Sequence, residues 1–334
     1  MHKPKALITG PYIIDFTGPN LRHDLGRQYF DMNHVSLVFC VQYRNVSCIY
    51  VDFGEGGTML LDCGEGTLEQ MRACFGNDRL QVELRRLRAI WISHFHADHH
   101  VGLSSVLYAR AQQLSCQCRS ANGELPIPIP LIGPKPLKNY LDDMSRENDL
   151  HFEWQDCADT ASGLLDNCTG RVRAELERLG VQALQSVPVD HCKHAYACVF
   201  WAGERQEKLV YSGDTRPCNS LTNAATDASL LVHEATFEDS LVDEAIEKRH
   251  SLVKEAVEVG ERAGARSTVL THFSQRYPKY PVMDGSYGSH TGVAFDMLTV
   301  SPSTVSRLTN LKEALQMLFR DDEAEEEALS EEVD

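Results

Sequence analysis

The densest cluster of metal-binding side chains in the sequence follows a short apolar segment, and this arrangement limits the folds open to the chain. Residues 88–93 are apolar and rich in β-forming types, which predicts a buried strand. Residues 94–99, His-Phe-His-Ala-Asp-His, then place four such side chains within six positions. Burying so many polar groups in a core without partners is costly, so we expect them on a loop after the strand. There the first two histidines can face one metal while Asp98 and His99 face its neighbour, and imidazole with carboxylate suits zinc or a similar divalent ion.

Strands and helices are expected to alternate in both halves of the chain, which indicates α/β layers. Two apolar runs around a Gly-rich turn at 55–57 predict a β-hairpin, and residues 67–70 match a capping box that would start a helix. Residues 116–176 give the weakest signals, with a Pro-rich strand pattern at 125–136. The other expected strands cover 88–93, 183–189, 195–201, 208–212, 229–232 and 268–271, and the expected helices cover 103–113, 136–145, 243–248 and 252–263.

More ligand-type or acid–base residues stand at the ends of later predicted strands, namely His191, Asp214, His233, Glu234 and His272. Each residue alone is weak evidence for a site, because a single histidine at a strand end is more often structural than a metal ligand. Their recurrence is informative, because α/β sheets place their sites at the carboxyl ends of strands. With His191, Asp214 and His272 the candidate ligands number seven, enough for two metals that share one carboxylate.

Composition excludes several classes of protein. Acidic residues outnumber basic ones 48 to 32 in the 334-residue chain, so a strongly basic nucleic-acid surface is not a global property. The 43% hydrophobic content excludes wholesale disorder. No apolar run approaches the roughly 20 residues that span a bilayer, so we expect no membrane partner. Eleven cysteines, an odd number, indicate reduced thiols and an intracellular compartment, whether nuclear, cytoplasmic or mitochondrial.

The negative charge is concentrated at the carboxyl end. Residues 321–334 hold nine acids and no base, which leaves −7 of the formal net charge of −16 on the rest of the chain. Such a run cannot build a core, so we expect a disordered acidic tail at 319–334.

Six segments together resemble a known family. They are 61–67 (Leu-Asp-Cys-Gly-Glu-Gly-Thr), 93–99, 191–195 (His-Cys-Lys-His-Ala), 211–215 (Tyr-Ser-Gly-Asp-Thr), 233–236 (His-Glu-Ala-Thr) and 271–277 (Thr-His-Phe-Ser-Gln-Arg-Tyr). The pattern resembles the metallo-β-lactamase superfamily and, within it, the tRNase Z family of tRNA 3′-processing endonucleases, over about residues 44–296. The His-Glu-Ala-Thr cluster makes the resemblance specific, because the superfamily's small-molecule hydrolases do not share it.

The resemblance implies an α/β metallo-β-lactamase fold, a four-layer αββα sandwich. The catalytic domain would cover 44–318, after a divergent segment at 1–43 joined to the first sheet. Two zinc ions are implied, with manganese as an alternative metal. His94, His96 and His191 would hold one ion, Asp98, His99 and His272 the other, and Asp214 would bridge them. Metals about 3.5–4 Å apart can share a hydroxide and clamp phosphate oxygens.

The implied reaction is hydroxide attack on a phosphodiester of precursor tRNA, which releases the 3′ trailer and leaves a 3′-hydroxyl. Asp98 would orient the nucleophile. The family protonates the leaving oxygen with the Glu of His-Glu-Ala-Thr and the His of a His-Ser-Thr motif, here Glu234 and His250. A carboxylate beside an imidazole raises the imidazole's pKa. The Thr is replaced by Leu252, and Ser251 is expected to cap the next helix; His250 as an ordinary surface histidine stays the alternative.

The segments that would contact RNA depart from the family pattern. Of its Pro-x-Lys-x-Arg-Asn element only Arg44 and Asn45 remain, and with Arg276 they are the expected substrate contacts. Only 22 residues separate His191 from Asp214, about one strand hairpin, where short tRNase Z enzymes carry a long arm that grips the tRNA. This spacing is similar to that in the carboxyl-terminal catalytic half of the long-form enzymes. We therefore expect weak activity on tRNA alone, and as partner either a second copy or a separate tRNA-gripping half.

Two other functions stay open. One is a small-molecule hydrolase of the same fold, a lactonase or thioesterase, against which the segments 233–236 and 271–277 argue. The other is a non-catalytic subunit that only binds metal, which the altered Lys and Thr positions favour and the complete ligand set opposes.

Overall fold

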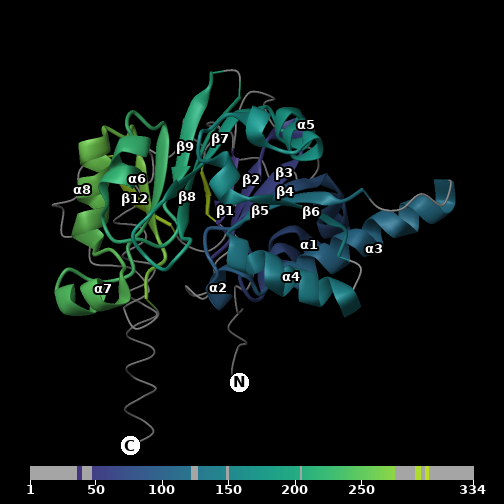
Figure 1. Ribbon diagram of the computed structural model, residues 1–334, viewed down its shortest axis with the longest axis horizontal. Helices are drawn as coiled ribbons and strands as arrows, with labels where there is room; N and C mark the ends of the chain where they lie inside the picture. Colours follow the sequence, from purple (N-terminus) through teal and green to yellow (C-terminus); the bar gives the residue numbers. More distant parts are fainter. Residues whose placement is uncertain are drawn as a thin grey trace, which may run out of the picture.

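Two β-sheets pack face to face, with helices on both outer sides (Figure 1). The computed structural model describes residues 36–39, 47–121, 127–147, 150–203, 205–274, 290–294 and 298–300. Strands and helices alternate through these residues, as the sequence predicts.

The first sheet has the strand order β13-β1-β2-β3-β4-β5-β6. β2 and β3 form the predicted antiparallel hairpin around a 3₁₀ turn at Gly54–Gly56. From β3 to β6 the strands run parallel, because helices connect them. The strands are β1 (Ser36–Phe39), β2 (Ile49–Asp52), β3 (Thr58–Leu61), β4 (Leu87–Trp91), β5 (Ile129–Gly133), β6 (Phe152–Asp156) and β13 (Thr299–Val300).

The second sheet has the order β12-β11-β10-β9-β8-β7. Its first three strands along the chain form an antiparallel meander, and the remaining pairs are parallel. β7, β9, β10 and β11 therefore all point the same way, and their carboxyl ends lie at one edge. The strands are β7 (Val181–Pro188), β8 (Tyr196–Ala202), β9 (Glu207–Tyr211), β10 (Leu230–Glu234), β11 (Thr268–Thr271) and β12 (Thr291–Val293).

Helices connect the parallel strands and cover the sheets from outside. They are α1 (Thr67–Arg86), α2 (Ala97–His100), α3 (Leu103–Ala121), α4 (Lys135–Glu147), α5 (Gly170–Arg178), α6 (Asn219–Ala224), α7 (Val242–Lys248) and α8 (Val253–Ala263). None of the helices in the described part of the chain is both long and apolar enough to cross a bilayer.

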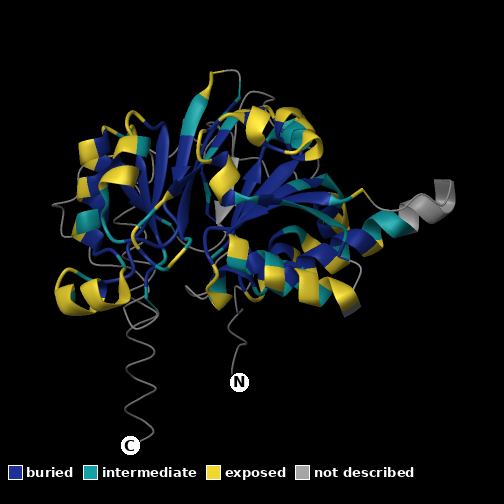
Figure 2. Ribbon diagram, in the orientation of Figure 1, coloured by how far each residue is buried: buried dark blue, intermediate teal, exposed yellow. Residues whose placement is uncertain are grey.

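The packing has three main apolar layers. The central one lies between the sheets and includes Trp91 of the first sheet and Phe200 of the second. Outside it, Met71 and Leu107 belong to the layer that joins the first sheet to α1, α3 and α4. On the other side Val259 belongs to the layer that joins the second sheet to α6 and α8. Figure 2 shows most of the strand residues dark blue and the outer faces of the helices mainly yellow. The expected four-layer αββα sandwich is confirmed.

The strands and helices named from the sequence are present, with ends that differ by a few residues, except that α3 runs on to Ala121. β6 and α5 were not predicted; β6 lies in the weakly patterned stretch at 116–176, and α5 begins in it and ends at Arg178. β6 has a mostly half-buried pattern rather than a continuous apolar run, so its strand signal is faint. α6 was also missed, because six residues are too few to show a helical period.

Two expected helix caps are wrong. α1 begins at Thr67 itself, after Gly66 in a left-handed conformation with φ 80°, so the Thr67 hydroxyl donates backwards to the Gly64 carbonyl (2.8 Å). Ser251 does not cap α8, because its hydroxyl donates to the Thr215 carbonyl (2.6 Å). Glu255 bonds the main-chain N–H of the N-cap residue Leu252 instead (2.9 Å).

The expected domain limits are covered only in part. β1 falls within the 1–43 segment and pairs with β2 of the first sheet. The acidic tail at 319–334 lies outside the described residues, and the limits 44–318 stay a prediction. The eight cysteines whose side chains the structure describes all carry free thiols.

We predict that Gly102→Ala lowers the free energy of unfolding by about 1–3 kcal/mol. A Cβ at this position would lie 2.1 Å from the Gly64 carbonyl oxygen, a backbone atom that cannot rotate away. The matched control is Gly170→Ala on α5, where a Cβ meets nothing within 4 Å, so its stability should stay within about 0.5 kcal/mol of the wild type. Urea unfolding measures both, and equal midpoints for the two variants would contradict this packing.

Candidate metal centre

The seven predicted ligands converge at the carboxyl ends of strands from both sheets. Residues 94–99 follow β4, and His191, Asp214 and His272 follow β7, β9 and β11. α2, which carries two of the predicted ligands, and α7 lie at the same lower end of the molecule (Figure 1). The chain thus brings together side chains that are up to 178 positions apart, from His94 to His272.

Three imidazoles form the first group. His96 Nδ1 lies 3.0 Å from His94 Nε2 and 3.1 Å from His191 Nε2. Burial lowers the pKa of all three histidines, which favours the neutral form that binds metal. The sulfur of Cys192 belongs to the same set of nearby ligand atoms, a neighbour for which the sequence gave no role.

Asp98, His99 and His272 form the second group. Asp98 Oδ2 lies 3.6 Å from His99 Nε2 and 3.7 Å from His272 Nε2. Burial lowers the pKa of His272, but the nearby Asp214 and Asp98 carboxylates outweigh it and raise the pKa to about 9.

Asp214 lies between the two groups and contacts both. Its Oδ2 is 3.6 Å from His94 Nε2 and 3.2 Å from His99 Nε2. Its Oδ1 is 3.5 Å from His272 Nε2. Asp214 is only 2% exposed. Burial alone would raise its pKa, but His272 and His99 outweigh burial, lower the pKa and keep the carboxylate ionised.

The residues fit a metal centre by their unpaired buried atoms. His99 Nε2 and Asp214 Oδ1 are buried and make no hydrogen bond among the described residues, and their ion-pair contacts at 3.2 Å and 3.5 Å are with other candidate ligands. Such groups are costly unless something pairs with them, and both residues belong to one set of nearby candidate ligands with His94. A divalent cation would pair with these atoms, and a set of imidazoles with two carboxylates suits zinc.

Glu234 and His250 form a hydrogen-bonded pair beside the centre. His250 Nδ1 lies 2.9 Å from Glu234 Oε1 and 3.9 Å from Asp214 Oδ2. Glu234 is fully buried and accepts further bonds from the main-chain N–H groups of Thr215 (2.7 Å) and Ser251 (3.1 Å). Burial lowers the pKa of His250, but the Glu234 carboxylate outweighs it and raises the pKa. His250 is therefore not an isolated surface histidine.

A model of a beta-lactamase superfamily domain matches residues 58–273, which include all seven predicted ligands. The chain belongs to this superfamily. The fold and the convergence of the ligands at strand ends agree with that membership.

Curated relatives within the superfamily carry tRNase Z names. The chain is 40% identical over 331 residues to the mitochondrial tRNase Z TRZ3 of Arabidopsis thaliana, covering 86% of this chain and 36% of the relative. It is 35% identical over 288 residues to the human zinc phosphodiesterase ELAC protein 2, covering 84% of this chain and 34% of the relative. The chain thus spans about a third of the length of these relatives.

Solved structures agree on the metallo-β-lactamase fold. A long-form RNase Z from yeast superposes with a TM-score of 0.74 at 23% identity, covering 88% of this chain and 45% of that one. The human short-form tRNase Z gives a TM-score of 0.58 at 23% identity, covering 80% of this chain and 98% of that one.

Three of the predicted histidine ligands make a second contact through their other ring nitrogen. His94 Nδ1 contacts the Ser93 hydroxyl (2.9 Å), His191 Nδ1 the Arg249 carbonyl (2.8 Å) and His272 Nδ1 the Thr236 hydroxyl (2.8 Å). Such contacts fix the orientation and tautomer of metal-binding imidazoles. All three rings therefore direct Nε2 toward the other candidate ligands.

Asp62 supports His99 from behind, a contact that the sequence reasoning missed. Its Oδ2 lies 2.7 Å from His99 Nδ1 and accepts from the Tyr211 hydroxyl (2.7 Å), while its Oδ1 accepts from Ser93 N–H (2.7 Å). Its position within the 61–67 motif, directly after β3, was the available signal. Asp62, Arg249 and His272 all have positive φ, of 61°, 57° and 62°, and such strain is often concentrated at functional sites.

Arg44, Asn45 and Arg276, the expected substrate contacts, lie outside the described residues. His233 of the His-Glu-Ala-Thr segment is fully buried, and its Nδ1 lies 2.6 Å from the Glu234 carbonyl. It belongs to none of the candidate ligand groups of the described chain.

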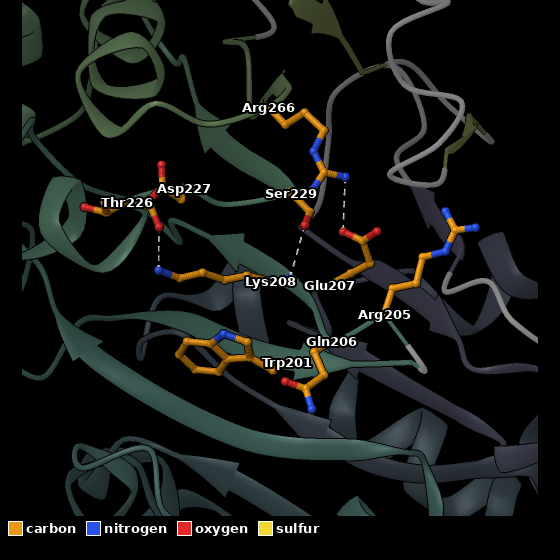
Figure 3. A pocket seen from close by; sticks show the side chains of 9 residues that line it. All are labelled: Trp201, Arg205, Gln206, Glu207, Lys208, Thr226, Asp227, Ser229 and Arg266. Atoms are coloured by element: carbon orange, nitrogen blue, oxygen red, sulfur yellow. Dashed lines mark hydrogen bonds and ion pairs between the residues drawn. The ribbon is translucent and has the colours of Figure 1, made fainter.

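A hollow of about 530 Å³ lies at the opposite end of the second sheet, by the β8–β9 turn (Figure 3). Its basic side chains are mostly paired within it: Lys208 Nζ donates to the Thr226 carbonyl (2.7 Å), and Arg266 lies 3.3 Å from Glu207. None of the predicted ligands lines it, so the chemistry belongs to the other end of the sheet.

We predict that Asp62→Asn weakens metal binding about 10- to 100-fold. The amide cannot serve as a charged acceptor for His99, which would lose its fixed orientation. A chelator titration of the zinc-loaded protein measures the affinity.

Two controls separate this effect from general loss of stability. Asp78→Asn changes the same residue type on the exposed face of α1. Tyr211→Phe removes another hydrogen bond from the Asp62 carboxylate and leaves His99 bonded. If Asp62→Asn and Tyr211→Phe bind zinc equally well, Asp62 does not act through His99.

Proposed function

We propose that this chain is the catalytic part of a metal-dependent endoribonuclease that removes the 3′ trailer from precursor tRNA and leaves a 3′-hydroxyl. One observation carries the proposal: two ligand groups share the buried Asp214, and the Glu234–His250 pair lies beside it, with His250 Nδ1 3.9 Å from Asp214 Oδ2. The relatives named tRNase Z and zinc phosphodiesterase support the same activity.

The proposed ligands are those expected from the sequence. His94, His96 and His191 would hold one ion, Asp98, His99 and His272 a second, and Asp214 would contact both. Zinc is the metal that the human relative's name supports, and manganese suits the same donors. Two divalent ions held there would neutralise negative charge on a phosphodiester. They would also lower the pKa of bound water to near neutral pH.

Asp98 and His250 would handle the protons. The Asp98 side chain is 48% exposed, so its carboxylate reaches the mouth of the site and can accept a hydrogen bond from the attacking water. Glu234 holds His250 through Nδ1, which leaves Nε2 to carry a proton to the departing 3′-oxygen. Because Glu234 is fixed by two main-chain N–H groups, the imidazole is held before substrate arrives.

Binding of tRNA would be weak for this chain alone. The connection between His191 and Asp214 is the β8–β9 hairpin with its short turn, which leaves no room for a gripping arm. We propose that Arg44, Asn45 and Arg276 contact the RNA, and that a second copy or a separate tRNA-gripping half completes the binding surface. The site of action would be intracellular, and the Arabidopsis relatives named mitochondrial support this.

The test is cleavage of end-labelled precursor tRNA by the zinc- or manganese-loaded chain. The wild type should release the 3′ trailer and leave a 3′-hydroxyl, Asp98→Ala should abolish cleavage, and His250→Ala should slow it about 100- to 10,000-fold. His290→Ala is the matched control. His290 is exposed at the opposite end of β11, so this substitution should leave the cleavage rate unchanged.

Parallel assays distinguish the alternatives. Hydrolysis of a thioester or lactone without cleavage of bis(p-nitrophenyl) phosphate would replace the nuclease with a small-molecule hydrolase. If the wild type and Asp98→Ala release equal amounts of product, the catalytic function is contradicted. Of the three hypotheses, only the non-catalytic subunit that binds metal would then remain.

A further inference from the structure

Arg216 links three loops of the site, and the reaction proposed above gives it no role. It stands two residues after Asp214, and its main-chain N–H donates to the Asp190 carbonyl (2.8 Å). Its guanidinium reaches the connection between α7 and α8, where Nη1 donates to the His250 carbonyl (2.7 Å). Arg216 therefore joins the segments that carry His191, Asp214 and His250.

Glu255 holds the guanidinium in this position. Arg216 Nη1 lies 2.7 Å from Glu255 Oε2, and Nη2 lies 2.5 Å from Oε1, so the two side chains form a bidentate pair. Glu255 is fixed in turn, because its Oε2 accepts from the main-chain N–H of Leu252 (2.9 Å) at the start of α8. Among basic side chains, only the planar guanidinium has the fork of donors that serves a carboxylate and a carbonyl together.

These contacts favour an internal role for Arg216 over a contact with RNA phosphates. The Arg216 side chain is 18% exposed and that of Glu255 is 24% exposed. The carboxylate neutralises the charge of the guanidinium, and the His250 carbonyl uses one of its N–H groups. What Arg216 supports is therefore the main chain of His250.

His250 is held at its main chain as well as at its ring. Its N–H donates to the Ala245 carbonyl (2.9 Å), and its carbonyl accepts from Arg216, so the main chain is fixed on both sides of the Cα. Glu234 Oε1 holds the ring through Nδ1 (2.9 Å). Together these bonds set the position of Nε2 before a substrate arrives. A displacement of about 1 Å in such a group can cost about 100-fold in rate.

We propose that Arg216 is a positioning residue for protonation of the leaving oxygen, and that it acts by holding His250 through its pair with Glu255. This inference rests on the nuclease function proposed above and adds a residue that binds neither metal nor RNA. Because Arg216 follows Asp214 closely in the chain, one short segment carries both the carboxylate between the ligand groups and the support of the proton donor. The separation of the two is thereby fixed.

The leaving group of the substrate reveals whether a residue acts through the proton donor. The 3′-oxygen of RNA is a strongly basic alkoxide unless it is protonated, so its departure depends on His250. The p-nitrophenolate released from bis(p-nitrophenyl) phosphate is a weak base and departs without a proton. Displacement of His250 should therefore slow RNA cleavage and spare the aryl ester, whereas damage to the metal centre should slow both.

The experiment measures single-turnover rates at saturating zinc-loaded protein on precursor tRNA and on bis(p-nitrophenyl) phosphate. We expect Arg216→Gln to cleave RNA about 100-fold more slowly than the wild type. Its rate on the aryl ester and its affinity for RNA should stay at the wild-type values. Glu255→Gln, which weakens the pair from the other side, should show the same preference with a smaller loss.

A double-mutant cycle tests whether Arg216 acts through His250. When Arg216→Gln is combined with His250→Ala, it should add nothing to the loss on RNA that His250→Ala causes alone, because one residue then acts only through the other. Arg266→Gln is the matched control and should leave both rates unchanged. It breaks the ion pair to Glu207 (3.3 Å) by the hollow at the opposite end of the second sheet.

Several outcomes would overturn the inference. They are an equal loss on both substrates, additive losses in the combined variant, loss of bound zinc from Arg216→Gln, and weaker RNA affinity at an unchanged cleavage rate. If the wild type does not cleave RNA, the nuclease function itself is contradicted, and the inference falls with it.

Discussion

The contact of the buried Asp214 carboxylate with imidazoles from several elements is the interaction on which the rest of the site depends. An ionised carboxylate at 2% exposure is costly unless positive charge compensates it. His99 after β4 and His272 after β11, whose pKa values the nearby carboxylates raise, supply that charge at 3.2 Å and 3.5 Å. The loops that carry them are therefore held together at the end of the two sheets.

The fold makes this convergence possible by its strand directions. β7, β9, β10 and β11 share one direction, so the segments that follow them meet at one edge, and β4 of the facing sheet brings residues 94–99 to the same place. Contacts that span the sheets hold this alignment, such as the bond from Trp91 Nε1 to the Ser186 hydroxyl (3.0 Å). The apolar layer between the sheets thus positions ligands that lie far apart in sequence.

The sequence predicted the parts of this arrangement that local patterns encode. Most of the strands were identified from apolar runs, and the ligand cluster at 94–99 from its density. The Glu234–His250 contact is at the place that the family resemblance implied. Asp62, Thr236 and the Arg249 carbonyl were missed, because each reaches its ligand histidine only after distant segments of the chain meet. Ser251 was misassigned for the same reason, since the distant Thr215 carbonyl accepts from its hydroxyl. Thr67 was misassigned because its hydroxyl bonds locally to the Gly64 carbonyl, three residues earlier.

The metal content of the purified chain tests this account most directly. After loading with excess zinc and removal of free metal, elemental analysis should find about two ions per chain. Asp214→Asn, which keeps the shape of the side chain and removes its charge, should hold fewer than about one. A wild-type chain that binds less than one ion, or an Asp214→Asn variant that binds as much as the wild type, would contradict a centre organised around Asp214.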